Sequence, residues 1–121
     1  MRQRIAAKRR PEFSVGIDGL TITRNHIPRQ VSWADITKVA AFKRDIYLGI
    51  VVCLAIEMED GATEHVIEGD DAWLDVMEAL HTNLPGIAKR ENWFLDMAAG
   101  KQDVILIYYR GGEALRHEAK F

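Results

Sequence analysis

The sequence predicts one α+β domain, an antiparallel β-barrel or curved sheet of about six to seven strands capped by a C-terminal helix. Apolar and polar residues alternate with period two in several short segments between residues 13 and 68. Two Asp-Gly pairs mark tight turns between such segments. An apolar stripe at three- and four-residue spacing follows them, and 121 residues, 48% of them hydrophobic, fit a single globular domain.

The first half of the chain predicts four strands. They span residues 13–17, 20–23, 29–33 and 36–44. The pair Asp18-Gly19 is the tight turn between the first two strands. Residues 25–28, which end in a proline, break the chain before the third strand. Residues 32–35 predict a turn or half-helix that leads into the fourth.

The clearest strand spans residues 50–59. Its bulky side chains share one face and are predicted to enter the core: Ile50, Val52, Leu54, Ile56 and Met58. The opposite face is small near its start, where Cys53 lies, and charged near its end. Asp60-Gly61 predicts a second hairpin turn, and residues 63–68 form the returning strand.

A helix is predicted to begin at Asp70, as N-cap, and to end at Asn83. Its buried stripe consists of Trp73, Val76, Met77, Leu80 and Leu84. Residues 91–99 predict either a second short helix or an irregular cover over the core. Residues 104–109 predict a strand that is apolar on both faces, which favours a central strand or one that pairs across a subunit boundary. In the second case Ile105, Ile107 and Tyr109 are the candidate interface of a homodimer.

The charges are unevenly distributed although the net charge is only −2. Residues 1–10 hold five basic residues and no acid, and they predict a basic disordered leader before a single domain at residues 11–110. Residues 111–121 predict a frayed polar tail. The stretch from Glu57 to Glu78 holds nine acids and no Lys or Arg. The leader lacks aromatic residues for base stacking and has little apolar bulk, so we expect no specific nucleic acid and no stable membrane association.

No stretch of the sequence carries a reactive motif, so we expect no enzyme, no cofactor and no metal. Cys53 lies in an apolar strand, where a thiol behaves as a small hydrophobic side chain. The four histidines are far apart, without the spacing of metal ligands. One catalytic alternative stays open, a small enzyme that uses Glu57 and His65 on the predicted hairpin. A single cysteine and the absence of a long apolar run predict a cytoplasmic protein.

Several segments together resemble the small bacterial members of the pleckstrin-homology-like (PH-like) group, proteins of uncharacterised function. These segments are Gly16-Ile17-Asp18-Gly19-Leu20, Val31-Ser32-Trp33-Ala34-Asp35-Ile36 with Val39, Ala41-Phe42-Lys43-Arg44-Asp45, Asp60-Gly61, the helix Trp73–Leu84 and the exit Leu84-Pro85-Gly86. The resemblance spans roughly residues 13–85 and implies a curved antiparallel barrel that serves as a binding module. The basic first-hairpin loop of inositol-phosphate-binding relatives is replaced here by the short acidic pair Asp18-Gly19.

Two hypotheses of function follow. The leading one is a non-catalytic PH-like protein, most simply a protein- or peptide-interaction module with an unknown protein partner. The alternative is a module that binds a small anion or a phospholipid headgroup. Its candidate ligand residues are the basic residues near predicted strand ends, namely Arg24, Arg29, Lys43 and Arg44.

Overall fold

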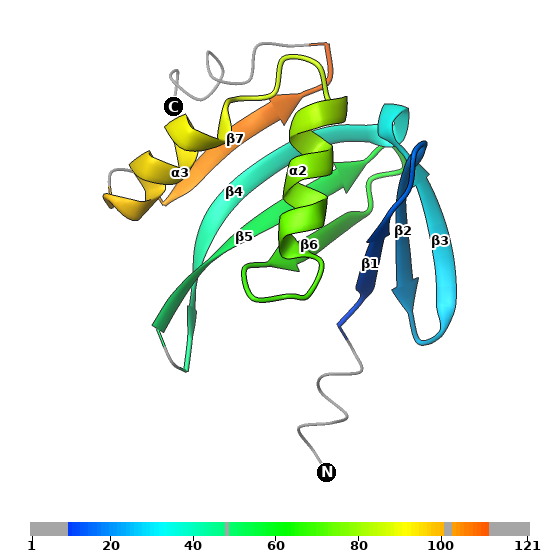
Figure 1. Ribbon diagram of the computed structural model, residues 1–121, viewed down its shortest axis with the longest axis horizontal. Coiled ribbons are helices and arrows are strands. Elements are labelled where there is room, and N and C mark those ends of the chain that lie inside the picture. Colours follow the sequence, from blue (N-terminus) through cyan, green and yellow to red (C-terminus); the bar gives the residue numbers. More distant parts are fainter. Residues whose placement is uncertain (1–9, 48, 101–102, 112–121) are drawn as a thin grey trace.

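The computed structural model describes residues 10–47, 49–100 and 103–111, and it is an open, curved α+β structure (Figure 1). One antiparallel sheet has the order β1-β2-β3, with β1 at Glu12–Val15, β2 at Gly19–Arg24 and β3 at Ile27–Ser32. The other has the order β6-β5-β4-β7, with β4 at Ile36–Ile46, β5 at Gly49–Met58, β6 at Thr63–Ile67 and β7 at Val104–Tyr109. The expected antiparallel α+β class is confirmed. Within the described residues, no strand pairing joins the two sheets.

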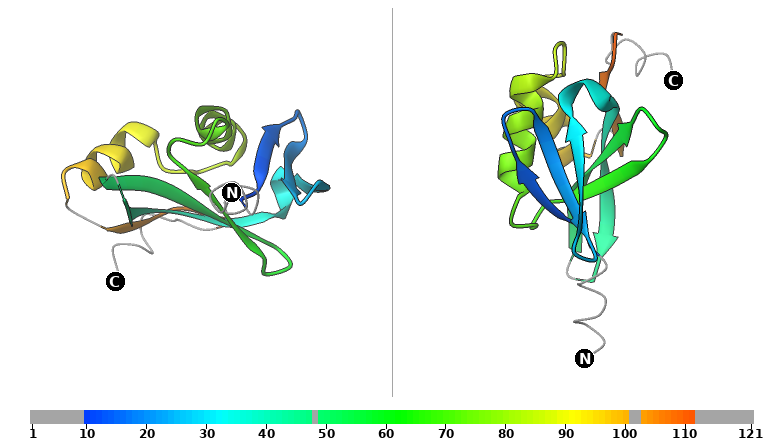
Figure 2. Two further views of the ribbon diagram at one scale, coloured as in Figure 1. Left: turned by 90° about the horizontal axis from the view of Figure 1, so that it is seen from below. Right: turned by 90° about the vertical axis from the view of Figure 1, so that its right-hand side faces the viewer.

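Two helices cover the same face of the four-stranded sheet, as the left view of Figure 2 shows. They are α2 at Trp73–Asn83 and α3 at Arg90–Ala98, and a short 3-10 helix, η1 at Trp33–Asp35, joins the two sheets. The core lies between this face, the helices and the three-stranded sheet, with Leu54, Leu80, Trp93 and Ile107 among its buried members. Neither described helix is long and apolar enough to cross a membrane.

The turn between β1 and β2 depends on a close approach of two backbones. A Cβ added to Gly19 overlaps the carbonyl oxygen of Val31 on the neighbouring strand, so no larger residue fits. The sequence correctly placed a turn here, but Gly19 is already the first residue of β2. The strand predicted to continue to Ile17 ends at Val15, and Ile17 lies in the turn with 91% of its surface exposed.

The β5 strand confirms most of the predicted core face. Val52, Leu54, Ile56 and Met58 are all 8% exposed or less. Ile50 was predicted to join them, and that prediction is wrong because it is 64% exposed. The end of the β4–β5 hairpin that contains Ile50 projects past both helices in Figure 1, so no helix covers its inner face there.

The start of α2 differs from the prediction. Asp70 is not the N-cap, because the helix begins at Trp73 after Ala72. The Asp70 carboxylate instead accepts a hydrogen bond from the backbone N–H of Ile67 (2.9 Å) and pairs with Arg10. Asp70 therefore closes the end of β6 rather than the start of the helix. The predicted stripe is buried as expected, and α3 confirms the helical alternative for residues 91–99.

The β7 strand lies at the edge of its sheet, paired with β4 alone. The prediction of a central strand within the chain is therefore wrong. The register shifts between Val39 and Ala40, which leaves Ile107 as an extra residue, and this bulge lets both Ile107 and Tyr108 enter the core. The bulge therefore accounts for the apolar pair Ile107 and Tyr108 at successive positions. The loop before α3 covers part of the edge, since the N–H of Ala88 donates to the Ile107 carbonyl (2.8 Å).

The substitution Gly19→Ala tests the close approach of β2 and β3. We expect it to lower the free energy of unfolding by about 1–3 kcal/mol, the usual cost of forcing atoms into filled space. Gly16→Ala is the matched control, because its added Cβ would meet only the Gly19 carbonyl at an ordinary 3.6 Å. Urea denaturation of both variants measures the difference. Equal stability of the two variants contradicts this account of Gly19.

Candidate functional site

The outer edge of β6 carries backbone groups without hydrogen-bond partners. Glu68 donates its N–H to the Val52 carbonyl (2.9 Å) and Met58 to the Ala62 carbonyl (2.8 Å), which fixes the bonded pairs of the β5–β6 ladder. Because bonded and non-bonded pairs alternate in an antiparallel ladder, the N–H and C=O groups of Thr63, His65 and Ile67 point away from β5. The Asp70 turn satisfies both groups of Ile67.

Thr63 and His65 are left as the open part of this edge. None of the residues that the structure describes accepts from or donates to their outward backbone groups. Both side chains are exposed, on the sheet face that the helices do not cover. The β6 edge, meaning here the outward backbone groups of Thr63 and His65, is therefore able to pair with another extended chain.

A hollow of about 500 Å³ lies beside the β6 edge. It is lined by residues from four parts of the chain, namely Arg10 and Pro11 before β1, Arg24 at the end of β2, Arg44 and Asp45 on β4, and Thr63, Glu64, His65 and Ile67 on β6. Three arginines and two acids give its described lining one net positive charge. The hollow thus combines free strand-pairing groups with an excess of guanidinium groups.

The sheet face beside the hollow is apolar. The rings of Phe42 and His65 meet edge to face, with centroids 5.3 Å apart. Cys53 lies one strand over, fully buried. Burial raises the pKa of the Cys53 thiol, and the nearby charges of Arg44 and Arg10 partly oppose that rise. Cys53 is therefore a packing residue, as expected from the sequence.

The four predicted ligand residues do not converge on one site. Arg24 and Arg44 line the hollow beside β6, whereas Arg29 lines a different hollow at the Asp60 turn. Most of them hold an acid of the same chain: Arg24 pairs with Glu64 (2.5 Å), Arg29 with Asp60 (2.6 Å) and Lys43 with Asp103 (3.7 Å). In the described part of the chain, Arg44 alone among the four has no hydrogen-bond or ion-pair partner.

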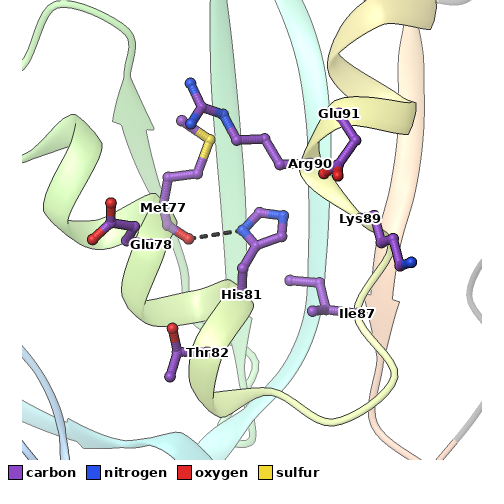
Figure 3. Close-up of a pocket in the computed structure, with 8 residues that line it drawn as sticks. All are labelled: Met77, Glu78, His81, Thr82, Ile87, Lys89, Arg90 and Glu91. Atoms are coloured by element: carbon purple, nitrogen blue, oxygen red, sulfur yellow. Dashed lines mark hydrogen bonds between the residues drawn. The ribbon is translucent and has the colours of Figure 1, made fainter.

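A second hollow, of about 330 Å³, lies between α2 and α3 (Figure 3). His81 stands in it with both ring nitrogens engaged. Its Nδ1 donates to the Met77 carbonyl (2.7 Å), and its Nε2 accepts from the Trp93 indole (3.1 Å). A carbonyl only accepts and an indole only donates, so these contacts fix one neutral tautomer. His81 therefore joins the two helices and has no nitrogen left for a metal or a proton transfer.

The two residues of the catalytic alternative on the hairpin contact different partners. Glu57 lies opposite Thr63 and pairs with Lys38 (3.8 Å), while His65 lies opposite Ala55 and packs on Phe42. Among the residues that the structure describes, no group of three or more His, Cys, Asp or Glu side chains is placed to hold a metal ion. In the same residues every buried side-chain nitrogen or oxygen has a partner.

The residues named for a homodimer lie in different environments. Ile105 and Ile107 are 3% and 0% exposed in the core of their own chain, so they do not form a surface in this fold. Tyr109 is 41% exposed at the end of β7. A substitution such as Ile107→Lys would therefore place a charge in the core, and it would report on folding rather than on association.

Two parts of the candidate site could not be found from the sequence motifs. Arg10 was assigned to the leader, yet it lines the hollow and pairs with Asp70. The rest of the predicted leader, and the tail beyond Gly111, lie outside the described residues. The free backbone groups of Thr63 and His65 depend on which strand pairs with β6, and no side-chain pattern records that.

Comparisons with protein-family models, curated proteins and solved structures found no match to this chain.

The Asp60 turn gives a testable pH dependence. The N–H of Ala62, and then Arg29, hold the pKa of Asp60 below its usual value. Asp60 therefore stabilises the fold above its unfolded pKa, and this contribution is lost as the pH falls through the lower folded pKa. We expect Arg29→Ala to raise the folded pKa only in part, because the Ala62 hydrogen bond remains, and Arg24→Ala to leave it unchanged. Carboxyl NMR titration measures the Asp60 pKa in wild type and in both variants. A wild-type Asp60 pKa at or above the ordinary value contradicts this account of the turn.

Proposed function

We propose that this domain is a non-catalytic binding module that takes up an extended peptide as an additional strand along the β6 edge. The observation that carries the proposal is the pair of unsatisfied residues Thr63 and His65 opening onto a hollow. Main-chain hydrogen bonds supply affinity in this mode of recognition, and side-chain contacts supply specificity. An exposed strand edge is otherwise a liability for aggregation, so a physiological partner gives it a use.

The surroundings of the edge favour an extended peptide. The two sheets are not joined by a ladder within the described residues, and the hollow is lined by β6, by the segment before β1, by the end of β2 and by β4. A strand placed there would pair with β6 on one side and contact Pro11 and Arg24 on the other. Its side chains on the uncovered face would meet the Phe42–His65 pair and Ile67.

The edge strand at the other side of the sheet is a weaker candidate. The carbonyl of Ile107 in the middle of β7 already accepts from Ala88, and the bulge there interrupts a regular ladder. A free small anion as the sole ligand is also less well supported, because three of the four predicted cations are held by acids of the chain. At the β6 edge the outward backbone groups of Thr63 and His65 are open among the described residues, and Arg44 has no described acid partner.

Kinship with the PH-like group is part of the proposal. Six antiparallel strands followed by a helix against a curved sheet support it. The additional helix α3 and the strand β7 that follow α2 lie beyond the segments that resemble the group. Binding without catalysis is the role that the resemblance implies.

Proline at position 65 tests the proposed function. The N–H of His65 points away from β5, so His65→Pro removes an outward donor without breaking the ladder. A library of random ten-residue peptides, displayed on phage and selected on the immobilised domain, supplies the ligands. We expect selected peptides to bind wild type and to lose at least about tenfold in affinity for His65→Pro, the value of one to two backbone hydrogen bonds.

The control is His65→Ala, which removes the imidazole but keeps the backbone donor. It should bind the same peptides within a few-fold of wild type. Thr63→Pro is the second outward-facing variant, in case His65→Pro does not fold by circular dichroism. Selection that enriches no peptide, or peptides that bind the proline variants as tightly as wild type, would end the proposal.

A further inference from the structure

We infer that the peptide carries an acidic side chain, and that the guanidinium of Arg44 binds this carboxylate at the β6 edge. The inference rests on the proposed strand addition and names the chemical class of its ligand. Arg44 and the free groups of β6 line the same hollow, so one bound chain can reach both.

Arg44 is the available cation of the hollow. Arg10 holds Asp70 and Arg24 holds Glu64, so each would have to give up an acid of this chain to bind a ligand. Arg44 is exposed and, among the described residues, has no acid or carbonyl to donate to. A guanidinium with its donors free suits a carboxylate, which it can bind with two parallel hydrogen bonds.

The position of Arg44 on the sheet supports the same reading. Arg44 pairs with Val51 in the β4–β5 ladder, and Phe42 pairs with Cys53 two residues earlier. Side chains alternate along a strand, so Arg44 shares the uncovered face with Phe42, whose ring contacts His65 on β6. Arg44 thus extends the row of side chains that an added strand would meet, toward the Ile67 end of β6.

The charges around Arg44 favour an acid over a base. Arg10, Arg24 and Arg44 line the hollow together with Asp45 and Glu64, which leaves a net charge of plus one in its described lining. The positive charges of Arg44 and Arg10 oppose the rise in the pKa of Cys53 that burial causes, whereas the Glu68 carboxylate adds to it, so the positive field of each arginine reaches Cys53. A lysine or arginine on the ligand would meet this field, whereas an aspartate or glutamate would be held by it.

Lys43 provides a matched control for Arg44. It is the neighbouring residue with the same charge, but it faces the other side of β4, pairs with Asp103 and does not line the hollow. Lys43→Gln and Arg44→Gln therefore remove the same charge from the same strand. Only the second removes a donor from the proposed site.

Three phage libraries of random nine-residue peptides, with the central residue fixed as acidic, amide or basic, test the inference. Each is selected on wild type, Arg44→Gln, Lys43→Gln and His65→Pro. We expect the acidic library to enrich roughly tenfold over the amide library on wild type and on Lys43→Gln, since a charge-assisted hydrogen bond contributes about this much. The advantage should disappear on Arg44→Gln, and raised salt should weaken it.

The possible outcomes separate the inference from the proposed function. If all three libraries are enriched equally on wild type and none is enriched on His65→Pro, the inference of an acidic side chain is overturned. The proposal of strand addition is then retained. No enrichment of any library on wild type overturns both. Vesicles of equal parts phosphatidylcholine and phosphatidylserine form the last arm. Vesicle binding that depends on Arg44 but not on position 65, without selection of acidic peptides, would replace the peptide by an anionic lipid surface.

Discussion

The long antiparallel ladder between β4 and β5 is the feature on which the rest of the structure depends. It runs from the Ile36–Met58 pair to the Ile46–Gly49 pair, and it gives one apolar face on which α2, α3 and the three-stranded sheet assemble. β5 pairs with β4 along its length and with β6 from Cys53 to Glu57, so the two edge strands of the sheet are β6 and β7. The two edge strands differ in how many of their outward backbone groups have hydrogen-bond partners, and the proposed function follows from that difference.

At one end, β7 places Ile105, Ile107 and Tyr108 in the core, and the loop before α3 satisfies a carbonyl at its centre. At the other end, the Asp70 turn satisfies only the last residue of β6. The gap beyond β6 is lined by arginines, of which Arg10 and Arg24 each hold an acid of the chain. Among the described residues, the hollow at the β6 end of the sheet therefore combines open pairing groups with a guanidinium, that of Arg44, that has no acid partner.

Much of the fold was predictable from the sequence because period-two alternation and Asp-Gly turns are local signals. The turn at Asp60 formed as expected, with the Asp60 carboxylate bound to the Ala62 N–H. The failures depend on contacts that are distant in sequence. Ile50 is exposed because no helix reaches the hairpin end, and Asp70 caps a strand because Ile67 and Arg10 come to it.

The candidate site was predictable only in part for the same reason. Strand-end position pointed to Arg24 and Arg44, which line the hollow, but it could not distinguish Arg44 from Lys43 and Arg29, whose acids come from residues 103 and 60. Arg44 is the candidate ligand residue because it has no described hydrogen-bond or ion-pair partner, and this depends on how the chain packs. The free groups of β6 are backbone N–H and C=O groups, so the amino-acid types along the strand do not reveal them.

Amide hydrogen exchange along β6 in the free domain measures the central claim most directly. The N–H groups of Glu64 and Val66 point into the β5 ladder, whereas those of Thr63 and His65 point outward. The account predicts slow exchange at residues 64 and 66 and fast exchange at residues 63 and 65. Protection of Thr63 and His65 equal to that of their neighbours would show that the edge is already paired, and would contradict the proposed binding site.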